Sequence, residues 1–311
     1  MRKDLLRPTT LEEYIGQEGI KDLLRTAITA ARGRNEPLDH ILLNGPPGLG
    51  KTTLANIIGR EMEWKIKAVI GPTLGGAADV EKLLAINWKP LTILFIDEVH
   101  RVRKPAQEVL YPVLEDNVLQ FSNSNMDLAP LTVIGATTNI GRLERPFIDR
   151  FGLSFQLQYY TYDELAEIIG GSAEKLKVKL TFAAIDQISY RARGTPRIAN
   201  NILKRIRDYA DVLMPKEVDA VFADKVITDK LHIDSMGLRL LDHRYMRALT
   251  GGKILGVDAI ASKLNEEVET VEDVVEPYLI RLGFINRERT GRCLTAEGER
   301  YLTSIPRTFG R

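Results

Sequence analysis

Several features that assign proteins to particular classes are scarce in this 311-residue sequence. The single cysteine, Cys293, excludes an internal disulfide, and we expect a small buried side chain rather than a nucleophile. No apolar run resembles a signal peptide or is long enough to cross a membrane, so a cytoplasmic protein without a membrane contact is expected. The four histidines show no metal-ligand spacing. The formal net charge is only +1, so any affinity for nucleic acid must come from local patches.

What the sequence does contain is enough apolar material for two or three domains, since 44% of its residues are hydrophobic. Short apolar segments alternate with helical segments from about residue 20 to residue 158, which predicts an α/β domain with a mostly parallel sheet. The five expected strands are residues 40–45, 64–70, 91–97, 131–138 and 153–158. We place this first domain at residues 1–161.

The remainder of the chain is predicted to be largely helical. Ile198, Ile202, Ile206 and Tyr209 recur at helical spacing, which is typical of a separate helical lid, placed at residues 162–233. A third domain is expected at residues 234–311. Its helices are expected near 236–249, 256–264 and 270–283, followed by a hairpin with a Thr-Gly turn at residues 290–291.

The strongest chemical signal is the segment "GPPGLGKT" at residues 45–52, which follows one predicted strand and precedes a helix. This is the pattern and the context of a P-loop, in which backbone amides and a helix N-terminus bind phosphate. Lys51 is expected to reach the β and γ phosphates of ATP, and the Thr52 hydroxyl to ligate Mg²⁺. The expected nucleotide-binding residues of this segment are Gly45, Pro46, Gly48, Leu49, Gly50, Lys51, Thr52 and Thr53.

The second signal is "LTILFIDEVH", an apolar strand that ends in two acids. Asp97 is expected to hold the magnesium ion, and Glu98 to orient and polarise the attacking water. The alternative is a pair of solvated acids. Thr138, at the end of another strand, is expected to meet the γ-phosphate or its water, unless its hydroxyl only caps a turn.

The segment "RGTPRIAN" places another cation near a helix start. Thr195 can cap the helix, Pro196 suits its first position, and Arg197 falls in its first turn. An arginine fixed in this way can reach from the lid to bound phosphate. The alternative is a solvated or salt-bridged side chain. These residues together predict an ATP hydrolase.

Five segments, "GPPGLGKTTLA", "LFIDEVHR", "GATT", "DRFG" and "RGTPRIANNILKRIRD", together resemble the AAA+ ATPases, and more narrowly the RuvB family of Holliday junction branch migration motors. "LLRPTTLEEYIGQ" and "EPYLIRLGFINRERTGRCLT" resemble that family's adenine-side segment and its winged helix. The resemblance extends from about Leu5 to Leu302. It implies a P-loop domain, a lid and a winged helix, assembled into a ring, expected to be a hexamer, that translocates duplex DNA during recombination and repair.

The resemblance also assigns residues that spacing alone does not. It implies that Arg150 is an arginine finger whose target is the γ-phosphate held by the neighbouring subunit; the alternative is a local ion pair with Asp149 or Glu144. The adenine pocket would be lined by Leu6, Arg7, Tyr14, Ile15 and Tyr160. Of these, Leu6 and Ile15 could equally be ordinary core residues.

The charge of the C-terminal domain reverses along its sequence. Residues 251–278 contain two lysines and seven acids, whereas residues 279–311 contain seven arginines and three acids. Arg287, Arg289 and Arg292 flank the expected hairpin tip, where a winged helix would touch a DNA backbone without reading bases. A solvated charged face is the alternative for each arginine.

One segment departs from the family pattern. Related sequences carry a long projecting hairpin with a Gly-Lys-Gly-Pro-Ser-like stretch, by which they dock on the junction-binding partner RuvA. Here the interval is only the 14 residues from Asn117 to Pro130, and the tip "SNSN" is polar. Ile148 and Thr290 also replace arginines that are usual in the family. The sequence therefore predicts weak or absent docking of a standard RuvA.

Two other functions remain open from the sequence. A clamp-loader-like or helicase-loader ATPase would share the P-loop and the finger and would remodel a protein ring. A nucleotide-switched regulator would instead use its winged helix to read a DNA sequence, with ATP controlling assembly. ATP turnover stimulated by duplex DNA of any sequence favours the motor over the regulator.

Overall fold

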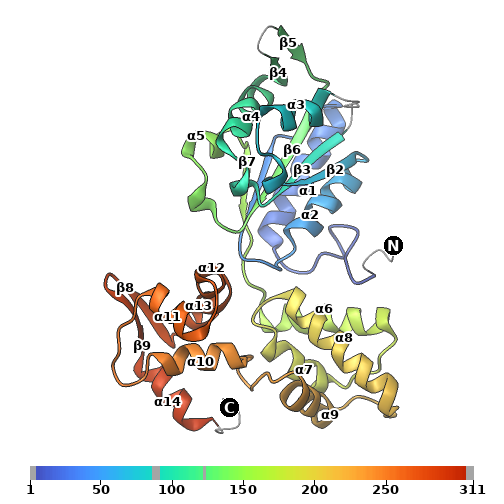
Figure 1. The fold of residues 1–311 in the computed structure, drawn as a ribbon. Helices are drawn as coiled ribbons and strands as arrows, with labels where there is room; N and C mark the ends of the chain where they lie inside the picture. Colours follow the sequence, from blue (N-terminus) through green and yellow to red (C-terminus); the bar gives the residue numbers. More distant parts are fainter. Residues whose placement is uncertain (1–4, 86–91, 122–123, 306–311) are drawn as a thin grey trace. The chain divides into compact units, whose positions relative to one another are not determined.

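The structure is a computed structural model that describes residues 5–85, 92–121 and 124–305 (Figure 1). Its contacts divide the chain into two compact units. The first contains the residues up to Ile168 together with Thr195–Arg197, and the second contains Ile169–Gly194 together with the residues from Ile198 onward. Most of the predicted lid and the whole C-terminal domain therefore lie in one unit. No helix in the described ranges has the length and apolar character needed to cross a membrane.

A five-stranded parallel sheet forms the centre of the first unit, in the order β2-β3-β6-β1-β7. The strands are β1 (Ile41–Asn44), β2 (Lys65–Ile70), β3 (Thr92–Asp97), β6 (Leu131–Thr137) and β7 (Leu153–Gln156). They confirm the five predicted strands, although residue 91 lies outside the described residues. Because the strands are parallel, the residues that follow β1, β3 and β6 meet at one edge of the sheet, where α/β proteins bind ligands.

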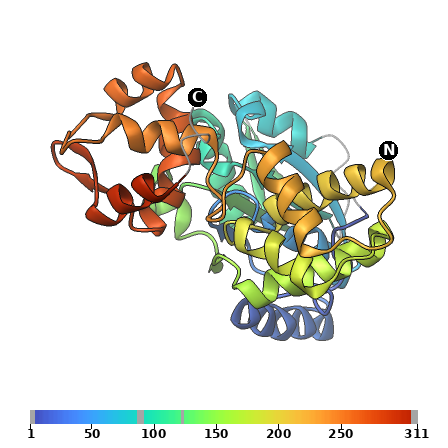
Figure 2. The same ribbon diagram turned by 90° about the horizontal axis from the view of Figure 1, so that it is seen from below.

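Helices cover both faces of this sheet (Figures 1 and 2). They are α1 (Glu18–Arg34), α2 (Lys51–Glu61), α3 (Ala77–Ala85), α4 (Lys104–Asp116) and α5 (Arg145–Ile148), with three short 3₁₀ turns, η1 (Gly71–Thr73), η2 (Val99–Arg101) and η3 (Ile140–Arg142). Side chains of α3, α4 and α5 enclose one core with strand residues such as Leu94 and Val133. The central strands are buried on both faces, which explains their continuous apolar sequences.

The short hairpin consists of β4 (Val118–Phe121) and β5 (Ser124–Asp127), paired antiparallel. Leu119 is fully buried and Leu128 is 8% exposed, and both belong to the core beneath α3 and α4, against which Met126 also packs. The first half of the polar tip predicted at residues 122–125 lies outside the described residues. Much of the apolar surface available for a partner is therefore already used inside this subunit.

The lid contains α6 (Tyr162–Leu176), α7 (Phe182–Arg191), α8 (Pro196–Leu213), α9 (Ala220–Lys225) and one π-helical turn, η4 (Val226–Lys230). Helix α8 begins at Pro196, as predicted. Of the predicted apolar stripe, Ile202 and Ile206 are buried, whereas Ile198 and Tyr209 are only half-buried. Ala199 and Leu203 complete the buried face.

The C-terminal domain has the helices and the two-stranded wing of the expected winged helix, and it has its own core. Its elements are α10 (Leu240–Ala248), α11 (Val257–Leu264), α12 (Val268–Thr270), the π-helical turn η5 (Val271–Val275), α13 (Glu276–Arg281), β8 (Ile285–Glu288), β9 (Gly291–Leu294) and α14 (Ala296–Ser304). The prediction of a Thr-Gly turn was wrong by one residue. Glu288 pairs with Gly291, so Arg289 and Thr290 form the turn. A Cβ on Gly291 would lie 2.5 Å from the Leu255 carbonyl oxygen, which explains the glycine.

Cys293 corrects another expectation. It is only partly buried, and its Sγ lies 3.3 Å from Glu288 Oε1. Desolvation and the neighbouring carboxylate raise the pKa of the thiol, which disfavours the thiolate needed for nucleophilic attack. The burial prediction was wrong because Cys293 lies on a two-stranded wing with one face open to solvent.

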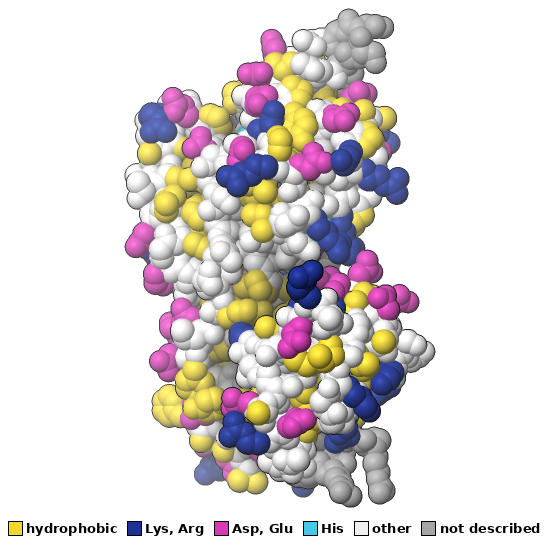
Figure 3. Space-filling model, turned by 90° about the vertical axis from the view of Figure 1, so that its left-hand side faces the viewer, with side chains coloured by type: hydrophobic (Ala, Val, Ile, Leu, Met, Phe, Trp, Pro, Cys, Tyr) yellow, Lys and Arg dark blue, Asp and Glu magenta, His cyan; other side chains and the backbone are white. Residues whose placement is uncertain are grey.

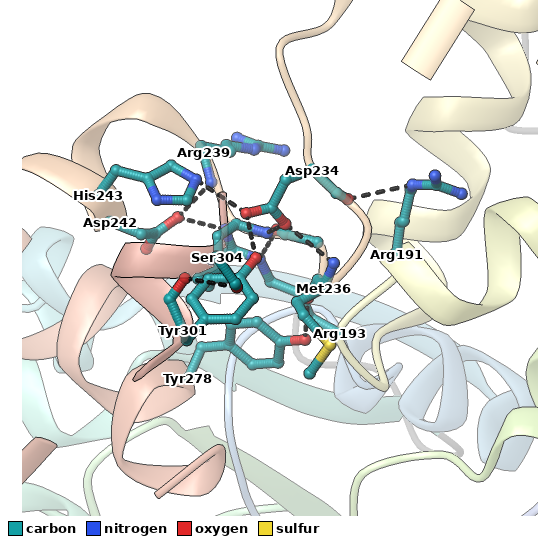
Figure 4. Close-up of polar contacts among 12 residues, drawn as sticks. Arg191, Arg193, Asp234, Met236, Arg239, Asp242, His243, Tyr278, Tyr301 and Ser304 are labelled. Carbon is teal, nitrogen blue, oxygen red and sulfur yellow. Dashed lines mark hydrogen bonds and ion pairs between the residues drawn. The ribbon is translucent and has the colours of Figure 1, made fainter. Parts of the chain in front are cut away.

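A polar joint connects the lid to the winged helix inside the second unit (Figure 4). Arg191 Nε donates to the Asp234 carbonyl oxygen at 3.1 Å. Arg193 forms an ion pair with Asp242, and its guanidinium lies 4.6 Å from the Tyr278 ring centre. Arg191 ends α7 and Arg193 follows it, so the connection that leaves α7 is tied to the winged helix.

The same joint is completed by a buried carboxylate. His243 Nε2 lies 2.8 Å from Asp234 Oδ2, and the Tyr301 hydroxyl donates to the same oxygen at 2.5 Å. Burial acts to raise the pKa of Asp234, but hydrogen bonds from His243 and Tyr301 outweigh it and lower that pKa. The predicted boundary at residues 233 and 234 therefore falls inside a set of buried contacts that unites the two domains.

Candidate functional site

The phosphate loop runs from the end of β1 to the start of α2. Gly45, Gly48 and Gly50 have φ values of 146°, 84° and 103°, which other residues adopt rarely. A Cβ at Gly48 would also lie 2.7 Å from Thr195 Cγ2. Gly50 caps α2 without a side-chain acceptor, so the amides of the first turn are left for a ligand. These features fit an anion such as the phosphates of ATP.

Lys51 lies inside this loop with 7% of its surface exposed. Its Nζ donates to the carbonyl oxygens of Gly45 at 2.5 Å and Pro46 at 3.0 Å. Burial lowers the pKa of Lys51, while Glu98 and Asp97 act to raise it. The ammonium is thus held at the loop, where it feels the charges of the two acids at the end of β3.

Strand β3 brings the first of these acids to α2. Asp97 Oδ2 accepts from the Thr52 hydroxyl at 3.4 Å, and Asp97 Oδ1 accepts from the Glu98 amide at 3.1 Å. A hydroxyl and a carboxylate are hard oxygen donors, which suit Mg²⁺. The sequence-predicted metal ligands, Thr52 and Asp97, are therefore neighbours in the structure.

Glu98 is turned toward the end of strand β6. Its backbone has φ 52°, a left-handed conformation, and its Oε2 accepts from the Thr138 hydroxyl at 3.0 Å. His100 Nδ1 lies 3.3 Å from the same oxygen and 2.9 Å from Thr137 Oγ1. Thr138 thus contacts the predicted water-polarising residue, a partner not foreseen for it.

Sequence reasoning missed His100, whose side chain is 4% exposed. His100 lies in turn η2, which brings its ring back to the Glu98 side chain. The signal that could have identified it is its place in "DEVH", close to both acids. Its ring bridges Glu98 and β6, so it holds the carboxylate in position.

The N-terminal segment and the end of the sheet form the predicted adenine side. The hydroxyls of Tyr14 and Tyr160 donate to the Leu49 carbonyl oxygen at 3.2 and 3.3 Å. Burial raises the pKa of both, that of Tyr160 to about 12. Gln17 exchanges two hydrogen bonds with the Gln158 backbone. Among the other predicted residues, Leu6 is buried, Ile15 is half-buried and Arg7 is exposed.

Arg197 lies in the first turn of α8 beside the phosphate loop. A Cβ at Gly48 would lie 3.0 Å from Arg197 Cβ, and Thr195–Arg197 belong to the first unit by their contacts. The Arg197 side chain is exposed. The structure thus brings Arg197 to the P-loop, where its charge also acts to lower the pKa of Lys51.

Arg150 has none of the local partners considered from the sequence. Asp149 pairs with Arg145 at 3.2 Å, and Glu144 pairs with Lys104 at 2.7 Å. Arg150 Nη2 instead lies 2.9 Å from Glu115 Oε1. Its described contacts are with α4 and α5, and none is with the phosphate loop of its own chain.

The three wing arginines differ in their surroundings. Arg287 and Arg292 both pair with the fully buried carboxylate of Glu276, at 2.6 and 2.9 Å, and Arg292 is only 15% exposed. Arg289 occupies the turn and has no ion pair among the described residues. On the face in Figure 3, charges of both signs are interspersed. The geometry therefore favours Arg289 for a phosphate contact and a structural role for Arg292.

Comparisons with known proteins agree over all three regions. Residues 6–157 match the model of the Holliday junction DNA helicase RuvB P-loop domain, residues 160–234 the RuvB AAA lid domain, and residues 235–303 the RuvB C-terminal winged helix domain. The chain is 39% identical to a Thermotoga maritima RuvB lysine-to-arginine mutant, with a TM-score of 0.90 over 97% of this chain and 100% of that one. The T. maritima structure described as a RuvB Holliday junction branch migration motor gives 39% identity and a TM-score of 0.89 over the same shares.

Proposed function

This chain belongs to the RuvB family, whose members are ATP-driven motors of Holliday junction branch migration, and we propose that it acts as a cytoplasmic ring of six subunits on duplex DNA. Such a motor serves recombination and repair. The observation that carries the proposal is the meeting of Lys51, Thr52, Asp97 and Glu98 at one sheet edge in a chain that also carries a winged helix. A clamp loader or a sequence-reading regulator is not favoured, since all three regions match RuvB.

ATP is held by the chain's own phosphate cradle in this proposal. The amides of residues 45–52 and the N-terminus of α2 bind the phosphate oxygens, and Lys51 adds a positive charge to them. Mg²⁺ would be held by Thr52 and Asp97, where it would neutralise phosphate charge. The hydroxyls of Tyr14 and Tyr160 hold the Leu49 carbonyl oxygen, which positions the loop.

Glu98 takes the proton of the attacking water in this scheme. Its carboxylate is held by Thr138 and His100, which leaves its second oxygen for the water. As the water oxygen bonds to the γ-phosphorus, the bond to the β–γ bridging oxygen breaks and Glu98 accepts the proton. Arg197 and the neighbour's Arg150 stabilise the charge on the γ-phosphoryl group.

A four-way junction assay tests the proposal. We expect the protein to separate a synthetic junction into two forked duplexes in the presence of ATP, with turnover stimulated by duplex DNA of any sequence. The assay is run with and without a RuvA-type protein, and a Lys51→Ala protein is the control. Sequence-selective binding with negligible turnover would instead identify a regulator.

The contact with RuvA is a separate proposal. The RuvB family acts on junction DNA and partners with RuvA, but this chain's hairpin offers little apolar area because Leu119 and Leu128 are core residues. At about 25 cal/mol per Å², even about 200 Å² contributes only about 5 kcal/mol before the costs of association. We propose that a standard RuvA binds weakly or not at all.

Calorimetry with purified RuvA checks this prediction. We expect weak or no binding, with a dissociation constant larger than micromolar. Submicromolar binding that is lost when Phe121 and Met126 are changed to serine would contradict the prediction and restore the usual docking mode.

Replacing residues 123–125 with glycine is expected to leave DNA-stimulated ATPase largely intact. Residue 123 lies outside the described residues.

A further inference from the structure

The proposed arginine finger is held by its own subunit. Arg150 Nη2 pairs with Glu115 Oε1 at 2.9 Å, and Nη1 donates to the Pro146 carbonyl oxygen. The guanidinium lies 4.3 Å from the centre of the Tyr111 ring. Only 21% of the side chain is exposed, and its Nε has no hydrogen-bond partner in the described part of the chain.

The surface that receives Arg150 is firmly anchored. Tyr111 and Glu115 are four residues apart on α4, so their side chains share one face of that helix. The Tyr111 ring packs on Phe147 at 5.9 Å, and Phe147, fully buried, packs on Phe151 at 5.5 Å. An aromatic row thus fixes the ring beneath the guanidinium, whereas Glu115 is 53% exposed and free to move away.

Two of the partners of Arg150, Tyr111 and Glu115, differ in what they do to its charge. A ring face stacks on the cation without neutralising it, whereas the Glu115 carboxylate is an anion in direct contact. A γ-phosphate from the neighbouring subunit carries more negative charge and would compete with Glu115 for the same guanidinium. Because Glu115 is 53% exposed, water weakens the pair enough for it to be displaced in this competition.

We propose that Glu115 is a positioning residue that holds the arginine finger in the lone subunit and releases it to the γ-phosphate across the ring interface. Tyr111 remains beneath the guanidinium and keeps it aimed. The inference rests on the proposed trans role of Arg150. The contact with Glu115 makes the finger available only where a neighbouring subunit presents a bound nucleotide.

The test compares Glu115→Gln with Asp116→Asn. Both changes remove one negative charge from adjacent exposed positions, but Asp116 has no described contact with Arg150. We expect Glu115→Gln to raise the kcat of DNA-stimulated ATP hydrolysis about threefold with an unchanged KM for ATP, because the finger acts in the transition state. Asp116→Asn is expected to match the parent protein. Thermal melting of each variant confirms that it is folded.

Mixed rings show which subunit must carry Glu115→Gln for hydrolysis to increase. When Lys51→Ala and Arg150→Ala chains are combined, the Lys51→Ala chain donates the intact finger. Adding Glu115→Gln to that chain is expected to raise the recovered hydrolysis about threefold, whereas adding it to the Arg150→Ala chain is expected to change nothing. A lowered or unchanged kcat for Glu115→Gln, or an equal effect on both chains, would overturn the inference. Full activity of Arg150→Ala would overturn the proposed finger itself.

Discussion

A Glu98→Gln protein is expected to bind ATP with parental affinity while its turnover falls by about a hundredfold or more. The amide keeps the size of the side chain and can still contact Thr138 and His100, but it cannot accept a proton from water. The phosphate loop and the Thr52–Asp97 pair are untouched. Fluorescent nucleotide binding and steady-state phosphate release measure the two properties separately.

Lys51→Ala is the contrasting variant, because it removes the ammonium from the phosphate loop itself. We expect it to lose nucleotide binding, hydrolysis or both. The two variants thus distinguish the binding of phosphate by the loop from the hydrolysis step. Parental hydrolysis by Glu98→Gln would show that another group activates the water.

Mixing two inactive proteins is expected to restore hydrolysis. An arginine finger supplied by a neighbour increases the rate by about a thousandfold or more, so Arg150→Ala and Lys51→Ala should each be nearly inactive alone. In a mixed ring, some interfaces join a Lys51 from one subunit to an Arg150 from the next. Phosphate release should therefore recover in part when the subunits exchange and coassemble.

The control for this experiment is proof of coassembly, for example by capturing one tagged variant and detecting the other. Each variant mixed with itself supplies the baseline. No recovery in proven mixed rings would contradict a site shared between subunits. A second control is a ring made only of chains that carry both Lys51→Ala and Arg150→Ala, because none of its interfaces has an intact Lys51 and an intact Arg150. Hydrolysis by this ring equal to that of the mixed rings would also contradict a shared site.

The sheet and the phosphate site were predictable because their signals are local. The glycines of the P-loop are required by their own backbone angles, and the strands carry continuous apolar runs. Thr52, Asp97 and Glu98 then meet because parallel strands end at one edge. Each inference needed only short sequence windows and one rule of topology.

What the sequence did not reveal depends on pairs of residues that are distant along the chain. The contact of Arg150 with Glu115 joins two elements separated by the hairpin and β6. Arg292 looked like a phosphate ligand because its sequence is basic, yet the buried Glu276, sixteen residues earlier, is paired with it. Neither spacing nor local charge indicates which acid a long side chain will reach.

The joint between the lid and the winged helix has a mechanical consequence. Helix α8 has 18 residues, and Arg197 in its first turn lies beside the phosphate loop. Asp234 and the two arginines before α8 fasten the winged helix to the end of α7 and the connection that follows it. The lid and the winged helix are therefore expected to turn together as one body.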